Sequence, residues 1–515
     1  MLRANRLSIL LLFLAGACTS AAEPERSDAS AADAAYADRG ADLYAAHCGV
    51  CHGEDGRGDG PAAPHLFPPA RRFDLGRFRL VSTENGAPTD ADLIATLRRG
   101  VPGSAMPAWG WLADEELALL AAHVRVLAVR GLARELAARA REEGLPAAPA
   151  EALETARAQL TPGRAIEAPR SVPTDAATLE HGRGLFAQHC AACHGPDGRG
   201  QRFPAPNPDG TPNWARDLHA GFLKGGGSAP AITARIRAGL PGTAMPALRL
   251  APRDEAALVA YVQRLVPAGA ADRLVHRRAR LAAVRVASLP AEVGDPAWGA
   301  ATVIRVVLAP LWWHDDAILA ADLAALHDGH ELAVRLSWED TTGEVRPFAD
   351  VRGSDAAALQ LSDAEHPALF GMGSPHRPTN LWHWRALRAE DLAGALDLFD
   401  PRVHAGVPGR ADVPVYRPAL GRLEASDRAD RITVRGVGPI AGAASAAGEV
   451  RADAHWEAGR WTVVFRRAFA DDGHGAVRLQ PGSSLQVAVA VWNAAAGDEG
   501  ARKSISIWQE LAIEP

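Results

Sequence analysis

Two Cys-x-x-Cys-His boxes are the residues of this chain whose types and spacing can most directly do chemistry. The residues are Cys48, Cys51 and His52 in the first box and Cys190, Cys193 and His194 in the second. Two thiols at this spacing can each form a thioether with a haem vinyl group, and the histidine that follows then lies under the iron as a ligand. The sequence therefore predicts two covalently attached haems.

The residues around the first box recur around the second at an offset of 142 residues. Residues 40–58 match 182–200, and a Gly-x-Ala-Met-Pro-Ala stretch occurs once in each copy. Each copy is predicted to contain a helix leading into the box, a Gly/Pro-rich middle, a short helix, a Met-Pro loop and a closing amphipathic helix. The closing helices are expected at 114–126 and 253–265. Two tandem copies of one small module follow from this pattern.

The order of elements in each copy resembles the small class I cytochrome c fold. In that family a loop methionine supplies the sixth iron ligand, so the resemblance implies that Met106 lies opposite His52. The same mapping gives Met245 as the partner of His194. Methionine often only fills a core, but two of the three methionines besides the initiator occupy the matching loop positions. Ligation is therefore the favoured interpretation.

Other histidines near the boxes are weaker candidates for the irons. His47 and His189 stand directly before the boxes, where they are badly placed to reach an iron. We expect them to contact solvent or to form a hydrogen bond near the haem. His65 and His219 could replace the methionines as distal ligands, which would lower the potential.

The fifth cysteine, Cys18, belongs to a predicted export signal. Two arginines precede an apolar run over 7–14, and small residues lead into Cys18. The run is too short for a transmembrane span. The pattern resembles the lipobox of bacterial lipoproteins, which implies a lipid anchor on Cys18, and Thr19 in place of Asp favours the outer membrane. Ordinary cleavage after Ala22 is the alternative, and it predicts a soluble periplasmic protein.

The sequence after residue 269 holds ten of the thirteen tryptophans, and its apolar residues begin to alternate. Alternation with a period of two predicts strands that bury one face. The expected inward residues are Leu332, Val334, Leu336 and Trp338 in one strand, Trp461, Val463 and Phe465 in a second, and Leu485, Val487, Val489 and Val491 in a third. We expect an antiparallel β-sandwich or barrel with a helical excursion near 391–399.

These patterns predict a multidomain fold of two small all-α cytochrome c domains followed by an all-β sandwich domain. The expected boundaries are 1–17 for a lipoprotein-type signal peptide, 18–34 for a tether, 35–128 for the first c domain, 129–175 for a linker, 176–268 for the second c domain and 269–515 for the β domain. The Ala/Arg/Glu-rich and then Pro-rich composition between the copies predicts a short helix followed by a semi-rigid tether.

Two singular residues stand in the β region. Met372 is the last methionine of the chain, and Lys503 is one of two lysines against 53 arginines. A deprotonated amine can ligate iron whereas a guanidinium group stays protonated, so a retained lysine points to a task that arginine cannot perform. On composition alone the alternative is chance survival at the surface, as expected for Lys224.

Several segments of the β region resemble the haem-b-binding gamma subunits of periplasmic molybdenum enzymes of the ethylbenzene and dimethylsulfide dehydrogenase type. The segments are 336–340, 370–384, 455–467 and 491–508. The resemblance implies a β-sandwich that holds one non-covalent haem b between a methionine and a lysine, which here are Met372 and Lys503. Residues 493–494 depart from the Asp-Gly turn common in the family, and its simplest members lack the c modules. Rival ligands near Met372 are His366, His376 and His383.

Protein ligands on both faces of three irons would leave no open site for a substrate, which predicts electron transfer without catalytic residues. The expected cofactors are two covalent haem c and one haem b, and the expected partners are redox proteins, among them molybdopterin and iron–sulfur subunits. The formal charge of −6, which becomes −8 without the two signal arginines, and the lack of a basic tract exclude nucleic-acid binding. A catalytic or substrate-binding β domain is the alternative, and a haem-free adhesion or carbohydrate-binding module is the third hypothesis.

Overall fold

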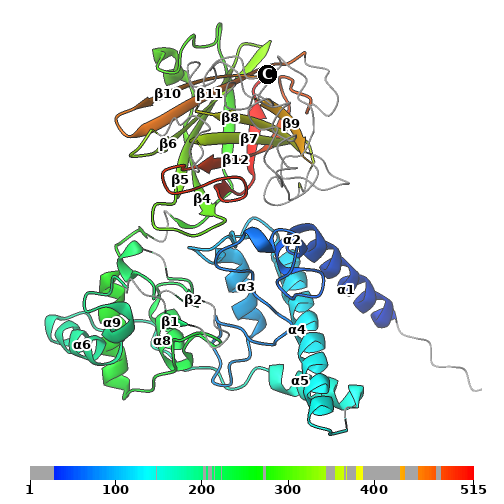
Figure 1. Ribbon diagram of the computed structural model, residues 1–515, viewed down its shortest axis with the longest axis vertical. Helices are drawn as coiled ribbons and strands as arrows, with labels where there is room; N and C mark the ends of the chain where they lie inside the picture. The colour runs from blue at the N-terminus through cyan, green and yellow to red at the C-terminus, as the bar shows by residue number, and fades with distance from the viewer. Residues whose placement is uncertain are drawn as a thin grey trace, which may run out of the picture.

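The computed structural model contains two helical modules that lie side by side and a β domain that rests on both (Figure 1). The structure describes residues 28–146, 148–200, 205–206, 212–213, 215–221, 223–270, 274–343, 354–364, 367, 379–386, 430–434, 450–470 and 477–515. Within this described part, no helix combines the length and the apolar content needed to cross a bilayer.

Module 1 contains the first Cys-x-x-Cys-His box. Its helices are α1 (Asp28–His47), α2 (Gly49–His52), the 3-10 helix η1 (Ala63–His65), α3 (Asp90–Arg99), α4 (Asp114–Glu142) and α5 (Pro149–Leu160). A capping box starts α3, because the Thr89 and Asp92 side chains each accept a hydrogen bond from the other residue's backbone N–H. α1 crosses α4 at Gly40, where a Cβ would lie 2.9 Å from the carbonyl oxygen of Leu119.

Module 2 repeats this arrangement around the second box. Its elements are α6 (Ala176–His189), α7 (Ala191–His194), β1 (Ala205–Pro206), β2 (Pro212–Asn213), η2 (Leu218–Ala220), α8 (Ala229–Ala238) and α9 (Pro252–Leu265). α9 matches the closing helix predicted at 253–265. The module is not purely helical as expected, because β1 and β2 pair antiparallel in its middle. α6 crosses α9 at Gly182, where a Cβ would lie 2.1 Å from the carbonyl oxygen of Ala257.

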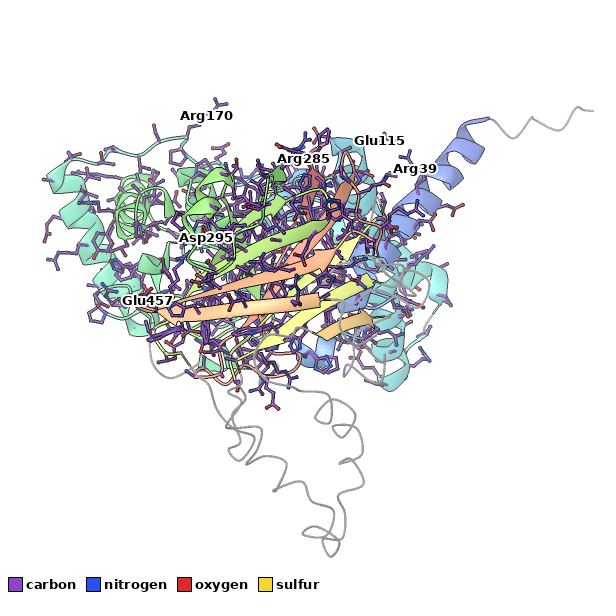
Figure 2. The ribbon with its side chains drawn as sticks, turned by 90° about the horizontal axis from the view of Figure 1, so that it is seen from above. Arg39, Glu115, Arg170, Arg285, Asp295 and Glu457 are labelled. Atoms are coloured by element: carbon purple, nitrogen blue, oxygen red, sulfur yellow. The ribbon has the colours of Figure 1, made fainter. Side chains whose placement is uncertain are left out.

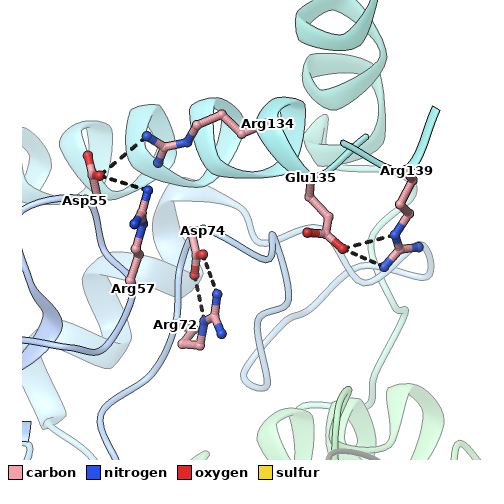
Figure 3. A network of polar contacts seen from close by, with 7 residues as sticks. All are labelled: Asp55, Arg57, Arg72, Asp74, Arg134, Glu135 and Arg139. Atoms are coloured by element: carbon pink, nitrogen blue, oxygen red, sulfur yellow. Dashed lines mark hydrogen bonds and ion pairs between the residues drawn. The ribbon is translucent and has the colours of Figure 1, made fainter. Parts of the chain in front are cut away.

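The closing helix of module 1 is longer than predicted, because α4 continues past residue 126 to Glu142. The added turns pack on the module: Leu127 is buried, and a Cβ at Gly131 would lie 2.2 Å from the Cα of Asp74. Arg134 of the same stretch pairs with Asp55 at 3.4 Å (Figure 3). The apolar residues spaced among its charges therefore cover a stripe of module 1, which the charge-rich composition concealed.

Much of the predicted linker also docks on module 1. α5 packs against α4 and buries Leu160 in the core of the module. Further along, the Ile166 N–H donates to the Ser82 carbonyl at 2.8 Å, and the Glu84 N–H donates to the Arg164 carbonyl at 2.9 Å. Residues 129–146 and 148–166 therefore form a docked helical hairpin and its exit, in place of the short helix and tether that composition predicted.

In the part of the β domain that the structure describes, twelve strands form one sheet. Its strands are β3 (Arg280–Arg285), β4 (Ile304–Pro310), β5 (Ala320–His327), β6 (Glu331–Glu339), β7 (Ala356–Ser362), β8 (Thr379–Arg385), β9 (Asp430–Val434), β10 (Val450–Glu457), β11 (Arg460–Ala468), β12 (Ser484–Trp492), β13 (Ser504–Ser506) and β14 (Gln509–Ile513). The order is β10-β11-β6-β5-β3-β14-β12-β7-β8-β9, with β13 paired to β12 and β4, and β4 paired to β5.

The sheet is mixed rather than antiparallel as predicted. Among the described strands, β3 pairs parallel with both β14 and β5, and the other pairs are antiparallel. The reason lies in the chain path, because β3 enters from module 2 and takes a place between the last strand and β5. A parallel pair needs a long crossover instead of a hairpin, and alternation along single strands carries no information about that choice.

The core of the β domain confirms the predicted alternation. The expected inward residues of β6, β11 and β12 all belong to one buried cluster. Trp384 on β8 lies 5.1 Å from Trp461 on β11, ring centroid to centroid, although these strands stand near opposite ends of the sheet order. The sheet therefore folds over to enclose one core, while charged residues such as Arg285 and Glu457 lie outside it (Figure 2).

The loop after β4 connects the β domain to both modules. The Phe67 N–H donates to the Leu311 carbonyl at 2.9 Å, and the Trp313 N–H donates to the Phe67 carbonyl at 2.7 Å. The rings of Phe67 and Trp312 lie 5.3 Å apart. On the module 2 side, the Arg216 guanidinium lies 5.2 Å from the ring centroid of Trp313. One short loop thus contacts both haem-box modules.

Gly182→Ala is expected to destabilise module 2, because the added Cβ would lie 2.1 Å from a backbone oxygen of α9. Overpacking of this kind costs about 1–3 kcal/mol in the free energy of unfolding, which denaturant unfolding of the haem-loaded chain followed by Soret circular dichroism would measure. The control is Gly184→Ala on the same helix, where a Cβ meets no atom within 4 Å. The control should be neutral or stabilising by up to about 1 kcal/mol, and equal stability of the two variants would contradict the close crossing.

Candidate functional site

A continuous cavity of about 510 Å³ runs through both helical modules. Its lining contains both boxes and both loop methionines: Cys48, Cys51, His52 and Met106 in module 1, and Cys190, Cys193, His194 and Met245 in module 2. The structure thus brings together, in each module, the four residues that the repeat singled out. The lining around them is mostly apolar, with side chains such as Leu97, Phe186 and Leu258, as a porphyrin requires.

The two box histidines are held by backbone carbonyls. His52 Nδ1 lies 2.9 Å from the Arg71 carbonyl oxygen, and His194 Nδ1 lies 3.2 Å from that of Arg216. Because a carbonyl only accepts hydrogen bonds, Nδ1 carries the proton and the lone pair of Nε2 is left for a metal. Burial lowers the pKa of both histidines, which favours the neutral imidazole that iron binds.

The four box cysteines are free and form no disulfide in the described part of the chain. Burial raises the pKa of Cys48 and Cys51 to about 12 and that of Cys190 to about 11. A thiolate, rather than a thiol, binds metals directly, so this environment suits thioether formation better than a metal–thiolate site. Among the described residues, no group of three or more His, Cys, Asp or Glu could hold a metal ion.

The two methionine loops are closed by the same hydrogen bonds. In module 1 the Ser104 hydroxyl donates to the Val101 carbonyl at 2.6 Å, and the Val101 N–H donates to the Met106 carbonyl at 3.0 Å. In module 2 the Thr243 hydroxyl donates to the Leu240 carbonyl at 2.7 Å, and the Leu240 N–H closes the loop onto Met245 at 3.1 Å. Both methionines are therefore presented from a preorganised turn.

A glycine just before each loop makes this closure possible. Gly100 and Gly239 cap α3 and α8 with φ of 68° and 63°. A Cβ would lie 2.5 Å from the Pro107 carbonyl carbon at the first position and 2.6 Å from the Met245 carbonyl oxygen at the second. Only glycine tolerates both the left-handed backbone and this contact.

The remaining histidines separate into two groups. His47 lines the cavity and is buried, with its ring 5.2 Å from that of Trp109, so the expected solvent contact does not occur. His189 also lines the cavity but is exposed. The alternative distal ligands His65 and His219 are not among the cavity-lining residues, and His219 Nε2 is instead bonded to the Asp197 carbonyl oxygen at 2.8 Å.

Lys503 lies in the β domain directly before β13. The residue is 8% exposed, and its Nζ lies 4.8 Å from the ring centroid of Trp492. Burial lowers the pKa of Lys503 to about 8, because charge is costly away from water. The amine is thus closer to its neutral, metal-binding form than an exposed lysine would be.

His383 of β8 lies beside the same tryptophan. Its ring is 5.4 Å from that of Trp492 in an edge-on arrangement. Burial, together with the charges of Arg385 and Lys503, lowers the pKa of His383 well below its ordinary value. Of the three rival histidines, His383 therefore approaches Lys503, whereas Met372, His366, His376 and Cys18 lie outside the described residues.

Small apolar side chains form the sheet surface around Lys503 and His383. The registers place His383 opposite Ala358 and Ala358 opposite Ala490, so these residues form a row across three strands. Ala356, Ala358 and Trp492 belong to a buried cluster distinct from the main core. These positions face away from the core and are nevertheless buried, so this side of the sheet offers the apolar surroundings that a macrocycle requires.

The sequence did not identify the two arginines whose backbone carbonyls accept hydrogen bonds from the box histidines. It also led to a wrong expectation for the position of Lys224. A sequence signal for both arginines exists, because each module has an Asp-Leu pair after its box. Arg71 precedes Arg-Phe-Asp-Leu in module 1, and Arg216 precedes Asp-Leu in module 2. Lys224 was expected at the surface but lines the cavity between the modules. Three glycines follow it directly, and they gave no sign of a place in a cavity.

Three family models match the chain, one in each domain. The model described as cytochrome C oxidase, cbb3-type, subunit III matches residues 35–124, and the cytochrome c model matches residues 179–265. The ethylbenzene dehydrogenase model matches residues 421–504. The two cytochrome c domains imply covalent haem c at the two boxes.

Among known proteins, a protein of Haloferax mediterranei named as a respiratory nitrate reductase heme subunit is 27% identical over 187 residues, which cover 36% of this chain. The match spans about half, 52%, of that relative. A chain of the reducing HAO-like protein complex of Kuenenia stuttgartiensis is 27% identical and covers 45% of this chain and 96% of that chain, with a TM-score of 0.37.

A carbohydrate binding module of family 9 from Caldicellulosiruptor kristjanssonii is 11% identical and covers 46% of this chain and 94% of that chain, with a TM-score of 0.25. Scores this low do not establish a shared fold. The family matches agree with the repeated geometry of the boxes and loops, and together they identify the domains of the chain. The chain joins two cytochrome c domains to a C-terminal domain that resembles the ethylbenzene dehydrogenase family.

Proposed function

We propose that this chain is an exported electron-transfer subunit that carries two c haems and one haem b. The c haems would be attached at the two boxes and ligated by His52 with Met106 and by His194 with Met245. The haem b would lie in the β domain, a β-sandwich in this proposal, between Met372 and Lys503. The observation that carries the proposal is the single cavity that reaches both boxes and both methionine loops, because electron transfer requires cofactors that approach one another.

The connection between the β domain and module 1 supports a relay that includes both. The Leu311 N–H donates to the carbonyl of Lys503 at 2.8 Å, and the Phe67 N–H donates to the carbonyl of Leu311 at 2.9 Å. The neighbours of Phe67, Leu66 and Pro68, line the module 1 part of the cavity. A chain of backbone hydrogen bonds thus leads from the proposed haem b ligand to the wall of the first c-haem site.

The residues around Lys503 fit a haem b. The buried amine lies over the ring of Trp492, which packs with Ala356 and Ala358. The lowered pKa of Lys503 reduces the cost of the deprotonation that iron binding requires. When bound, the haem would supply one-electron chemistry, and the protein would supply ligands on both faces and exclude solvent. His383 is the competing ligand because it lies beside the same Trp492.

The partner in this proposal is a periplasmic redox enzyme with molybdopterin and iron–sulfur subunits, and the membrane contact is a lipid on Cys18. The relative named as a nitrate reductase heme subunit and the ethylbenzene dehydrogenase match support a partner of the redox-enzyme class. The acidic net charge of −6 argues against a nucleic-acid partner.

The haem count tests the proposal directly. The purified chain should retain two haems in acidified acetone, because two boxes provide thioether bonds, and should release one. Pyridine haemochrome spectra of the pellet and the extract measure both. A sample that contains haem c alone would refute the haem b site.

Met106→Ala and Met245→Ala should each leave haem attached but lower the potential of that module's haem. The thioethers and the box histidine remain in both variants. A methionine sulfur ligand favours ferrous iron, so its loss should lower the potential. We expect the redox equilibrium to shift more than tenfold, about 59 mV for one electron, in an optical redox titration. His65→Ala and His219→Ala are the controls for the alternative ligands, and a larger shift in those variants would move the ligands to the histidines.

Lys503→Arg should lose haem b or convert it to a high-spin form while both c haems persist, because guanidinium does not deprotonate to bind iron. Lys224→Arg, the same substitution at the only other lysine, is the matched control and should keep a low-spin b spectrum. His383→Ala completes the set. A normal b spectrum in Lys503→Arg together with its loss in His383→Ala would transfer ligation to the histidine.

A further inference from the structure

The cavity between the two modules carries a concentration of basic residues that no haem attachment or iron ligation explains. Its members come from both modules and all line the cavity: Arg71 and Arg79 from module 1, and Arg216, Lys224 and Arg235 from module 2. We refer to these five residues as the junction cluster.

The junction cluster lies where the modules bond to each other. Arg235 donates from Nη1 to the Arg79 carbonyl at 3.1 Å and from Nη2 to the Val81 carbonyl. Arg99 Nε donates to the Lys224 carbonyl at 3.2 Å. These acceptors are neutral backbone oxygens, so the hydrogen bonds do not cancel the positive charges. The Nε of Arg235 is buried and has no hydrogen-bond partner among the described residues.

The charges that lower the pKa of Lys224 are of its own sign. Burial and then the positive charges of Arg216, Arg79 and Arg71 lower the pKa of Lys224 to about 7. Burial also lowers the pKa of Arg216 and Arg235 to about 10, and acidic groups partly offset this lowering. Asp217 and Asp315 act on Arg216, and Asp92 acts on Arg235. All five side chains of the junction cluster are half-buried, and like charges gathered partly away from water are costly unless an anion joins them.

We propose that the junction cluster binds the propionate carboxylates of both c haems, so that the two cofactors share one electrostatic site at the module interface. Each haem c brings two carboxylates, and the cavity that contains the thioether cysteines of both modules also contains all five basic side chains. Arg71 and Arg216 are bonded through their carbonyls to the two box histidines, so their side chains start beside the two haems. The inference rests on the proposed loading of both modules with haem.

Sharing the cluster couples the two haems. A positive charge near a haem disfavours the ferric state, which carries one more positive charge than the ferrous state. The charges of Arg71 and Arg79 of module 1 and of Arg216 of module 2 act on Lys224. Removal of the Lys224 charge should therefore change the potentials of both c haems. A cluster that served one haem would change only one.

The test is an optical redox titration of the full haem-loaded chain. Lys224→Gln should shift both c-haem equilibria toward the oxidised form at least threefold, about 28 mV for one electron. Arg79→Gln, from the other module, should do the same and guards against a local folding defect in module 2. Arg253→Gln, an exposed arginine at the start of α9, is the charge-matched control and should change neither potential. Lys224→Arg keeps the positive charge, so both c-haem potentials should stay at their wild-type values.

Each other result overturns the shared cluster. A shift of one potential in both Gln variants would assign the cluster to one haem, and no shift in either would remove it from both. A shift of the wild-type potentials on adding inorganic phosphate would assign the cluster to a free anion instead of the propionates. Pyridine haemochrome of the same samples separates the proposals: unshifted potentials with two covalent haems refute the cluster alone, whereas missing covalent haem refutes the proposed function as well.

Discussion

Each helical module depends on one helix crossing, between the helix that ends at the Cys-x-x-Cys-His box and the helix that closes the module. Gly40 and Gly182 sit at these crossings, and a Cβ at either would come within 3 Å of a backbone oxygen of the partner helix. The contact is therefore made by backbone atoms. Because it does not depend on side-chain shape, the two modules can differ widely in sequence and still hold the box opposite the methionine loop.

Backbone contacts also control how the β domain meets module 1. Lys503 contributes its carbonyl to Leu311, and Leu311 bonds in turn to Phe67, while the Lys503 side chain faces Trp492. The structural and chemical roles of this residue are thus divided between its main chain and its side chain. A side-chain substitution can remove the amine and leave the domain junction intact, so effects on haem b are separable from effects on domain association.

The sequence predicted those features that are encoded by local spacing. The boxes and the methionine loops are short motifs, and they line the cavity as predicted. The inward residues of β6, β11 and β12 follow from alternation with a period of two, and they form part of the main core. Features set by long-range packing could not be read in this way. The extension of α4 to Glu142 depends on contact with Asp74, and the parallel pairs of β3 depend on how distant strands meet.

The two lysines illustrate the limit of an argument from composition. In a chain with 53 arginines, the rarity of lysine singled out Lys503 and applied equally to Lys224, which was nevertheless expected at the surface. Lys503 is buried and Lys224 is half-buried, and burial lowers the pKa of these two lysines to about 8 and about 7 respectively. Arginine stays charged in such places, whereas lysine can yield its proton when no anion is present and regain it when one arrives. Retention of lysine therefore indicates a site, shielded from water, where the side chain must be able to lose or hold its proton. Iron ligation needs the neutral amine, whereas a carboxylate that enters a cluster of arginines needs the charged one.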